Sequence, residues 1–226
     1  MNAHVSPLVD ASQVESTRYA LIRRLGFVFR HHLVVNLQPL NMVCQVLHHR
    51  LGATTLDAPA LRDGVDQISR LVRTSIDSCA EVVSWIAADP RSTMAFGVGV
   101  NECLANVRSS FSFRGFTMHY DESSLATAVR QVAVREVLTA ALLATTDHAN
   151  GLDELLVTMA PVVGGVDIAI QMRRGANVSC AEQDAYRLIE WDDVRALAAF
   201  HDVRFSRHGD DTVALHFSQS QEAPAT

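Results

Sequence analysis

Apolar residues recur at alternating steps of three and four along residues 21–51, which is the spacing of a helix packed inside a bundle. Upstream, Ser12 to Glu15 form a candidate capping box, so we expect one helix over residues 12–51. Pro39 should kink this helix rather than end it, because the stripe continues in phase beyond it. The stripe consists of Ile22, Leu25 with Gly26, Phe29, Leu33, Leu37, Leu40, Cys44, Leu47 and Leu51.

A second periodic segment follows after a short connection. Gly52 is expected to end the first helix, and Asp57 with Pro59 to begin another over residues 58–88. So short a connection predicts an antiparallel hairpin, whose helices cannot cover both stripes by themselves. We therefore expect a homodimer in which two hairpins form a four-helix bundle. The second stripe consists of Leu61, Val65, Ile68, Val72, Ser75 with Ile76, Cys79, Val82 and Ile86.

The pattern changes after a linker at residues 88–92. Alternating and helical periods then succeed each other, which predicts an α/β sandwich as a second domain over residues 93–218. The expected fold class is thus α+β, with a hairpin domain over 12–88 preceding the sandwich. The tail after residue 218 is expected to be disordered. Helices are predicted at 98–112, 125–148 and 184–200, and strands at 116–120, 155–159, 166–172, 203–206 and 212–217.

Composition limits the functional classes. The chain is 48% hydrophobic but has no run near the ~20 apolar residues of a membrane span, and its first residues do not read as a signal peptide. A net charge of −6 argues against nucleic acid as the partner. The four cysteines are scattered, which is typical of a reducing cytoplasm. All 19 basic residues are arginine, which excludes a Walker A loop and Schiff-base chemistry.

The paired histidines on the first predicted helix, His31 and His32, are the candidate reactive residues. At ~100° per residue, His31 lies opposite the apolar stripe and should face water, whereas His32 borders the stripe. An exposed imidazole on a rigid helix, with Arg30 beside it, suits a phosphoryl acceptor. The ordinary alternative is a solvated histidine without a role, because most exposed histidines have none. No His or Cys spacing in the chain suits a metal site.

This arrangement resembles the two-domain transmitter of bacterial sensor histidine kinases, a phosphotransfer hairpin followed by a Bergerat-type ATPase domain. Apolar residues flank the family's histidine two before it and two, six and nine after it, and Phe29, Leu33, Leu37 and Leu40 occupy those offsets from His31. The run from Arg30 to Gln38 also looks like the R-H-D-φ-φ-N-x-L-Q signature of sporulation-type phosphotransferases.

Next to the histidine, this sequence departs from the family's pattern at two positions. His32 replaces the acid that usually follows, and Val35 replaces the polar residue at the fourth position after His31. If Asn36 is counted as that fourth-position residue, the acceptor becomes His32, as in the H-x-V-x-N-L of another kinase subfamily. The resemblance leaves both histidines open, and because the helical phase exposes His31, His31 is the first choice of acceptor and His32 the second.

The second domain resembles the ATPase in plan but lacks its chemistry. Ala144 stands where the family's magnesium-binding asparagine is expected, and Arg173 stands where a carboxylate would bind the adenine amino group. An arginine offers only hydrogen-bond donors there. No second glycine-rich box follows. The resemblance therefore implies a degenerate ATPase domain that does not bind ATP, and we expect no cofactor.

Together these features indicate a dimeric cytoplasmic histidine phosphotransferase of a two-component phosphorelay, rather than an autophosphorylating kinase. A response-regulator receiver domain would deliver and accept the phosphoryl group through its aspartate and would supply Mg²⁺. Arg30 and Arg24 are candidate contacts with that partner, although both could be ordinary solvated charges. Two alternatives remain open, a divergent histidine kinase and a non-catalytic regulator that sequesters a response regulator.

Overall fold

The chain consists of two compact units. The computed structural model describes residues 10–53, 57–120, 125–149, 151–175, 186–209 and 211–220. Residues Gly26–Ala88 form one unit, whereas the residues up to Leu25 join those from Asp89 onward in the other. The expected boundary placed the whole first helix in the hairpin domain. The structure instead groups the first turns of that helix with the sandwich.

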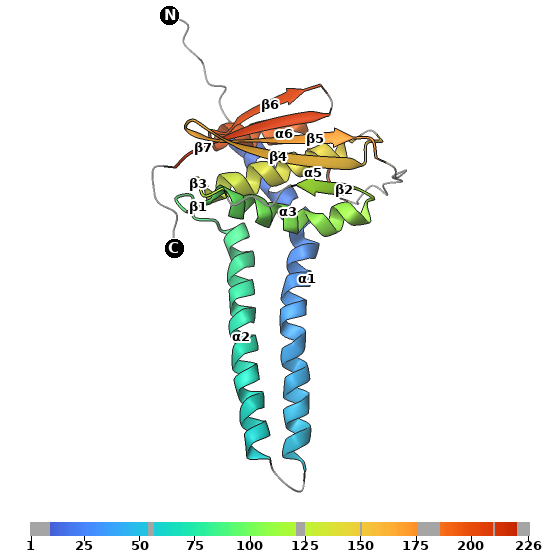
Figure 1. Ribbon diagram of the computed structural model, residues 1–226, viewed down its shortest axis with the longest axis vertical. Coiled ribbons are helices and arrows are strands. Elements are labelled where there is room, and N and C mark those ends of the chain that lie inside the picture. Colours follow the sequence, from blue (N-terminus) through green and yellow to red (C-terminus); the bar gives the residue numbers. More distant parts are fainter. Residues whose placement is uncertain are drawn as a thin grey trace, which may run out of the picture. The chain divides into compact units, whose positions relative to one another are not determined.

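The helical hairpin is confirmed. Helix α1 (Ala11–Leu51) contains Pro39 without ending there, and helix α2 (Ala58–Ile86) returns antiparallel beside it (Figure 1). Asp57 caps α2 as expected, because its carboxylate accepts the Ala60 backbone N–H at 3.1 Å. The start of α1 differs from the capping box proposed at Ser12. Asp10 precedes the helix and its carboxylate accepts the Ser12 N–H at 2.9 Å.

Three kinds of contact hold the hairpin helices together. The rings of Phe29 and Trp85 lie 5.9 Å apart between centroids. The Asn36 side-chain amide donates to the Ser78 hydroxyl, and the Ser75 hydroxyl donates to the Asn36 carbonyl at 3.2 Å. At Gly64 the helices approach so closely that an added Cβ would lie 2.4 Å from Cδ2 of Leu47. Because these contacts are spread along the hairpin, they fix which residues of α1 and α2 lie at the same level.

The close approach at Gly64 gives the first stability prediction. In Gly64→Ala the new methyl would also lie 2.9 Å from Cγ of Leu47, which cannot swing away as a terminal atom could. Forcing extra volume into a packed contact typically costs ~1–3 kcal/mol, against less than ~1 kcal/mol that alanine gains in helix propensity. We therefore expect Gly64→Ala to lower the free energy of unfolding, measured in urea. A variant as stable as the wild type or more so would contradict the observed packing.

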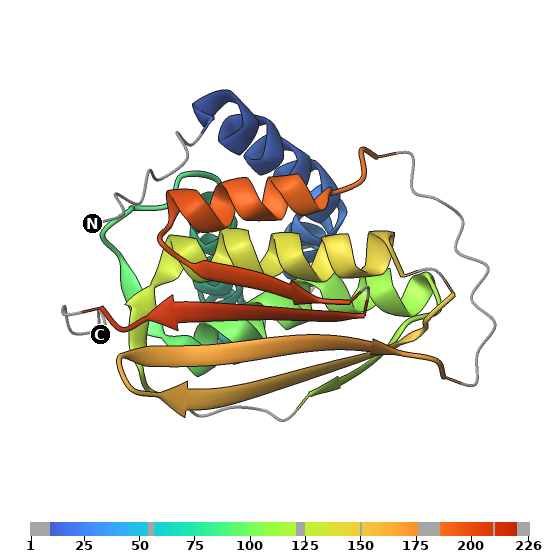
Figure 2. The same ribbon diagram turned by 90° about the horizontal axis from the view of Figure 1, so that it is seen from above.

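The second unit is built on a mixed five-stranded sheet with the order β2-β4-β5-β7-β6. Only the β2–β4 pair is parallel. Buried side chains alternate along the central strands, so one face of the sheet packs on helices and the other is open (Figure 2). The strands are β2 (Thr117–Tyr120), β4 (Glu154–Val162), β5 (Gly165–Arg173), β6 (Arg204–His208) and β7 (Thr212–Ser218).

Helices cover the buried face of this sheet, and the rings of Phe96 and Phe217 join the two layers with centroids 5.3 Å apart. A helix had been predicted over residues 125–148, but its beginning is extended. Strand β3 (Ala128–Arg130) pairs there with β1 (Thr93–Ala95), and Val129 is fully buried. The helical elements are α3 (Phe96–Phe113), α4 (Gln131–Ala133), the π-helical η1 (Val134–Leu138), α5 (Thr139–Asp147) and α6 (Trp191–Phe200).

The other predicted elements lie close to where they were expected, and the predicted tail lies mostly outside the described residues. Helix α6 begins at Trp191, later than the predicted start at residue 184, which is itself not described. Within the described ranges, no helix combines the length and apolar character needed to cross a membrane.

Candidate functional site

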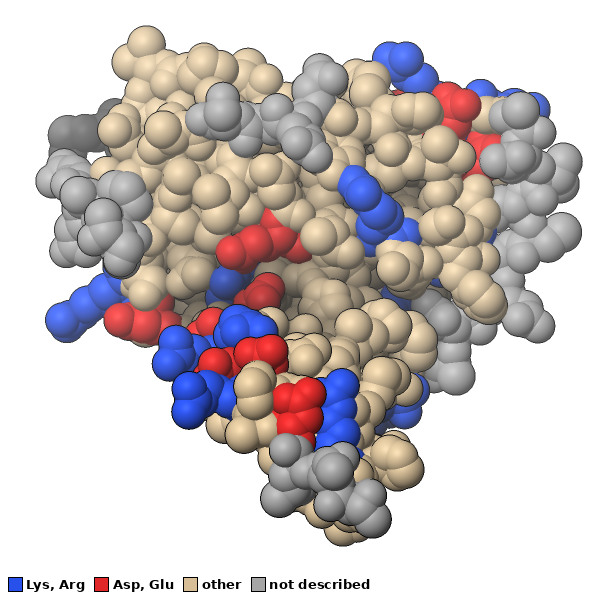
Figure 3. All heavy atoms as spheres, turned by 60° about the horizontal axis from the view of Figure 1, so that its bottom comes forward, with Lys and Arg blue, Asp and Glu red and all other residues tan. Residues whose placement is uncertain are grey.

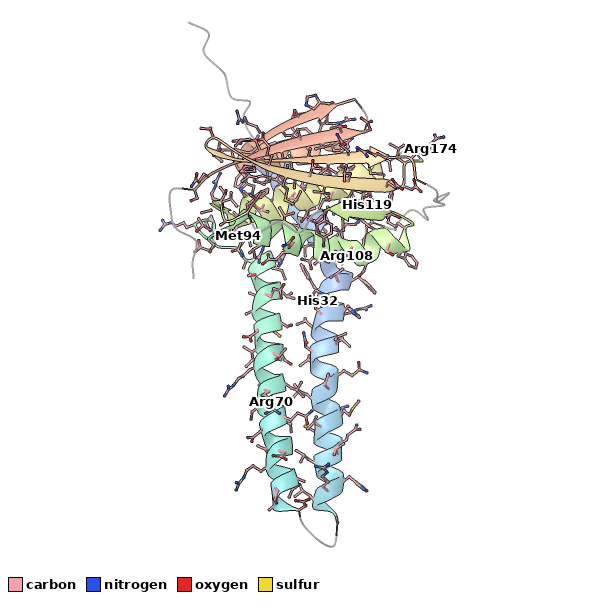
Figure 4. The ribbon with its side chains drawn as sticks, viewed as in Figure 1. His32, Arg70, Met94, Arg108, His119 and Arg174 are labelled. Atoms are coloured by element: carbon pink, nitrogen blue, oxygen red, sulfur yellow. The ribbon has the colours of Figure 1, made fainter. Side chains whose placement is uncertain are left out.

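The paired histidines lie within the uninterrupted helix α1. His32, labelled in Figure 4, is half-buried. His31 is exposed, and the two ring centroids lie 6.4 Å apart. Both positions agree with the helical phase read from the sequence. The backbone beneath them is fixed on either side, by Phe29 against Trp85 and by Asn36 against α2. His31 is therefore a solvent-facing imidazole held on a rigid support.

The apolar stripe of α1 is only half covered by α2. Phe29 is buried and Leu33 and Leu40 are half-buried, whereas Leu37 is 49% exposed and Leu51 is 59% exposed. The covered and exposed positions alternate in a regular way. On α1 each exposed member follows a covered one by four residues: Leu33 with Leu37, Leu40 with Cys44, and Leu47 with Leu51.

The stripe of α2 shows the same alternation. Its exposed members include Val65 at 56%, Val72 at 39% and Ile86 at 56%. Four residues advance a helix by only ~40°, so these positions border the contact with α1. Because α1 and α2 run antiparallel, the same step turns both sets of side chains toward one face of the hairpin. The pairs on α2 are Leu61 with Val65, Ile68 with Val72, Ser75 with Cys79, and Val82 with Ile86.

The two arginines expected to contact a partner differ in their surroundings. Arg30 is exposed beside His31, and its guanidinium lies 5.7 Å from the Phe27 ring centroid. Arg24 is buried, with a side chain only 3% exposed, and its guanidinium binds both Asp147 oxygens at 2.9 and 3.1 Å. The expectation that Arg24 steers a partner is therefore corrected. A guanidinium enclosed by its ion pair is a structural residue of the sandwich.

Asp147 is the centre of this buried network. Its carboxylate is completely buried and also lies 3.1 Å from the Arg114 guanidinium, while the Ile189 backbone N–H donates to it at 3.0 Å. Two cations and a backbone donor compensate the buried charge, as a carboxylate out of water requires. The network joins the first turns of α1 to the end of α5 and to the segment before α6.

At the two positions that the resemblance assigns to nucleotide binding, Ala144 offers no metal ligand and Arg173 offers no hydrogen-bond acceptor. Ala144 is fully buried within α5. Arg173 is exposed at the end of β5, where its guanidinium donates to the Gln171 side chain at 3.2 Å. At the start of α6, Glu190 and Asp193 form a reciprocal capping box with each other's backbone. This helix terminus is thus already occupied by carboxylates, which disfavour a phosphate.

Asp193 is the second buried carboxylate. It accepts hydrogen bonds from Arg187 at 2.8 Å, from the Glu190 N–H at 2.9 Å and from the Thr17 hydroxyl at 3.0 Å. Burial by itself raises the pKa of Asp193, but the hydrogen bonds from Arg187, Glu190 and Thr17 outweigh it, so the net pKa is lowered. The ionised form is therefore the one that stabilises the fold.

Asp193→Asn is accordingly expected to lower the free energy of unfolding of the sandwich by ~1–3 kcal/mol at pH 7, because donors remain partly unsatisfied. A depressed folded pKa contributes stability above the unfolded value of ~4 that is lost as the pH falls through the folded pKa. The difference between wild type and variant should therefore shrink below pH ~4, measured by urea unfolding. An unchanged difference at low pH would contradict the assigned role.

One polar cluster was not found from the sequence. Glu136, in the π-helical turn η1, binds the Arg18 guanidinium at 2.9 Å and the His201 ring at 2.7 Å. The side chain of His201 is 3% exposed. These residues come from distant parts of the chain, and no spacing in the sequence connects them. The described residues contain no group of three or more His, Cys, Asp or Glu that could hold a metal ion.

Comparisons with known proteins give similarity in structure only. No family model and no curated protein matches the sequence. Among solved structures, the histidine kinase AdeS of Acinetobacter baumannii is 13% identical, with 81% of this chain and 98% of that one covered and a TM-score of 0.42. The nucleotide-free catalytic domain of histidine kinase ThkA is 7% identical, with 58% and 98% covered and a TM-score of 0.42. Likenesses at this level carry no information about activity.

Proposed function

We propose that this chain is a dimeric histidine phosphotransferase that moves a phosphoryl group between receiver-domain aspartates through His31. The observation that carries the proposal is the exposed His31 ring on a helix fixed by contacts on either side of it. Phosphoryl transfer depends mainly on positioning and electrostatics, so a rigidly presented imidazole suffices on this side of the reaction. Exposed Arg30 is the expected contact with the anionic partner.

The transfer step needs little from this chain besides the ring. The lone pair of a neutral ring nitrogen forms the new P–N bond, the P–O bond to the aspartate breaks, and the carboxylate leaves with the electron pair. The proton on the other ring nitrogen stays in place. Mg²⁺ would come with the receiver domain, and the second transfer reverses these steps.

Dimerisation is part of the proposal. Both helices expose a regular set of apolar side chains on the same face of the hairpin, and a second copy of that face is the surface that matches it. Two hairpins joined there form a four-helix bundle. His31 lies on the side of α1 away from both contacts and stays accessible in the dimer.

The test is phosphotransfer from a phosphorylated receiver domain of the same organism. We expect label to move to the chain as an acid-labile, alkali-stable phosphoramidate, with no self-labelling from ATP. Failure of every receiver in such a screen would overturn the proposal.

We also expect no ATP or ADP binding in the micromolar range with Mg²⁺, measured by calorimetry. Ala144 offers no metal ligand, Arg173 offers no acceptor for an amino group, and the start of α6 is closed by its own carboxylates. Micromolar affinity, or self-labelling from ATP, would instead favour the divergent kinase.

A further inference from the structure

Strand β6 lies at the end of the sheet order β2-β4-β5-β7-β6. It pairs antiparallel with β7 from Arg204 to His208, and no described strand lies along its other side. In Figure 1 that side forms the upper rim of the sheet. Alternate backbone N–H and C=O groups of an edge strand point away from the sheet, where they can pair with a further strand. The β6 edge is this unpaired side of the strand together with the side chains of residues 204–208.

The charged side chains of the β6 edge have a single sign. Arg204, Arg207 and His208 are exposed, as is Ser206, and the strand contains no carboxylate. On the hairpin, by contrast, acidic and basic side chains lie intermixed over part of the surface (Figure 3). A strip of cations favours an anionic partner, because complementary charges steer the encounter and like charges repel.

Two carboxylates near β6 already have cationic partners. Asp167 lies on β5, beyond β7, and its carboxylate is 2.6 Å from Nδ1 of His216. The carboxylate of Asp202 lies 3.5 Å from the Arg130 guanidinium. Among the residues that the structure describes, Arg204 has no hydrogen-bond or ion-pair partner, so its guanidinium is available to an anion from outside.

On the face of the sheet that packs on helices, an aromatic surface adjoins the β6 edge. The rings of Phe205 and Trp191 stack with centroids 6.3 Å apart and planes 19° from parallel, and both residues are half-buried. The Arg207 guanidinium lies 4.4 Å from the centroid of the Trp191 ring. Half-buried aromatic rings beside a free strand edge offer an anchor for an apolar side chain of a partner.

On the open face of the sheet, the β6 edge adjoins a hollow. Arg204, Ser206 and His208 project to this face, because they pair with the non-buried residues of β7. The hollow has a volume of about 680 Å³, and Arg204 contributes to its lining. It gives the side chains of a strand added beside β6 room to lean over the sheet. Small side chains line it in one row across four strands, namely Thr158, Ala169, Ala214 and Ser206.

We propose that the β6 edge binds an extended segment of a partner protein, in which acidic and apolar residues alternate, by adding that segment to the sheet as a further strand. Acidic side chains of the segment lie on the open face beside Arg204 and His208. Apolar side chains lie on the other face against Phe205 and Trp191. In this mode of recognition the backbone hydrogen bonds supply affinity and the alternate side chains supply specificity. The inference does not depend on the proposed phosphotransfer.

A second copy of this chain matches the β6 edge poorly. Antiparallel pairing of two such edges about Ser206 would place Arg204 of each copy opposite His208 of the other, and it would bring no carboxylate into the contact. Cations on edge strands commonly prevent identical copies from pairing. The same cations select an acidic segment, because specificity rests on repulsion of the wrong partner as well as on attraction of the right one.

The first experiment tests strand addition. The protein, isotopically labelled for NMR, is titrated with a short capped peptide of alternating glutamate and valine. We expect shifts and slower hydrogen exchange at the amides of β6, with those of β2 at the other end of the sheet unchanged. The same peptide with a methylated backbone keeps its side chains but loses its N–H donors, so it should not bind. Equal binding of both peptides, or no shifts at millimolar peptide, would overturn the inference.

The second experiment reverses the charge of the edge. Arg204→Glu changes an exposed side chain, so the fold should be retained. We expect the glutamate–valine peptide to bind about tenfold more weakly and a lysine–valine peptide to bind more tightly, because attraction and repulsion are exchanged.

Arg174→Glu is the matched control, because it makes the same change in net charge at another exposed position. Arg174, labelled in Figure 4, lies ~23 Å along the sheet from the level of Arg204, so the variant should bind both peptides as the wild type does. If the two variants weaken binding equally, the attraction is a general charge effect and the inference fails. If Arg204→Glu instead changes the oligomeric state and leaves peptide binding intact, the edge binds a second copy and the inference also fails.

Discussion

Replacing His31 with glutamine should abolish phosphoryl transfer while leaving the protein folded. An amide is no nucleophile toward phosphorus, so no phosphoramidate can form at that position. The side chain is exposed, and surface substitutions usually change stability by no more than ~0.5 kcal/mol, so unfolding cannot explain the loss. The measurement is the rate at which label leaves a phosphorylated receiver and remains on the chain as an alkali-stable product.

His32→Gln is the matched comparison, because it changes the adjacent, half-buried ring. We expect only a partial reduction in rate, through altered packing or orientation. If the His31→Gln variant accepts phosphate at the wild-type rate and the His32→Gln variant accepts none, the acceptor is His32 and not His31. If both variants accept phosphate, neither ring is required by itself, and the assignment of the acceptor to His31 is wrong. If the variant His31→Gln still binds the receiver and blocks its output, sequestration is the better description of the function.

Leu37→Glu should separate the dimer without unfolding the hairpin of a single chain. Leu37 is 49% exposed within one chain, so a carboxylate there still reaches water in the monomer. In the dimer the same carboxylate would be buried without a partner in each chain, which costs several kcal/mol. We expect the dissociation constant to rise at least ~100-fold, equivalent to about 3 kcal/mol, measured by analytical ultracentrifugation.

Gln38→Glu is the control for that substitution, because Gln38 is exposed on the polar side of α1. It should leave the dimer intact. A wild-type protein that sediments as a 24.7 kDa monomer at micromolar concentration would contradict the dimer before any variant is needed.

Cysteine reactivity gives a second readout of the dimer. Cys44 and Cys79 are exposed within one chain and lie on the proposed dimer face. In a Cys180→Ser background they should react slowly with a thiol reagent in the wild type and rapidly in Leu37→Glu. Cys103 should stay inert in both, because burial raises the pKa of its thiol to about 12.

The long helices were predictable because their signal is local and repeated. An apolar period sustained from Ile22 to Leu51 specifies a helix whatever surrounds it, and α1 extends over that range. The exposure of His31 followed from the same phase. The sequence could not locate the short β1–β3 pair. Strands of three residues have almost no periodicity, and their pairing joins Thr93 to Arg130 across the intervening helix α3.

Arg24 shows why charges on a helix are hard to interpret from sequence. It was expected to contact a partner or to be a solvated charge, but its ion-pair partner Asp147 is 123 positions away. Only the fold brings that carboxylate to it. The same holds for Thr17 with Asp193 and for Arg18 with Glu136. Long-range polar pairs leave no pattern in the local sequence, so the first turns of α1 were assigned to the hairpin rather than to the sandwich.

Because those three pairs tie the first turns of α1 to the sandwich, the hairpin is an insertion within the sandwich sequence. The sandwich begins with the first turns of α1, is interrupted by Gly26–Ala88, and resumes at Asp89. A fragment starting at residue 89 would leave Asp147 and Asp193 without Arg24 and Thr17, and it should be poorly stable. The hairpin, by contrast, can be exchanged as a cassette between residues 25 and 89. Under the proposed function, a chimera with a foreign hairpin would keep this sandwich and take its phosphoryl acceptor and its receiver specificity from the foreign hairpin.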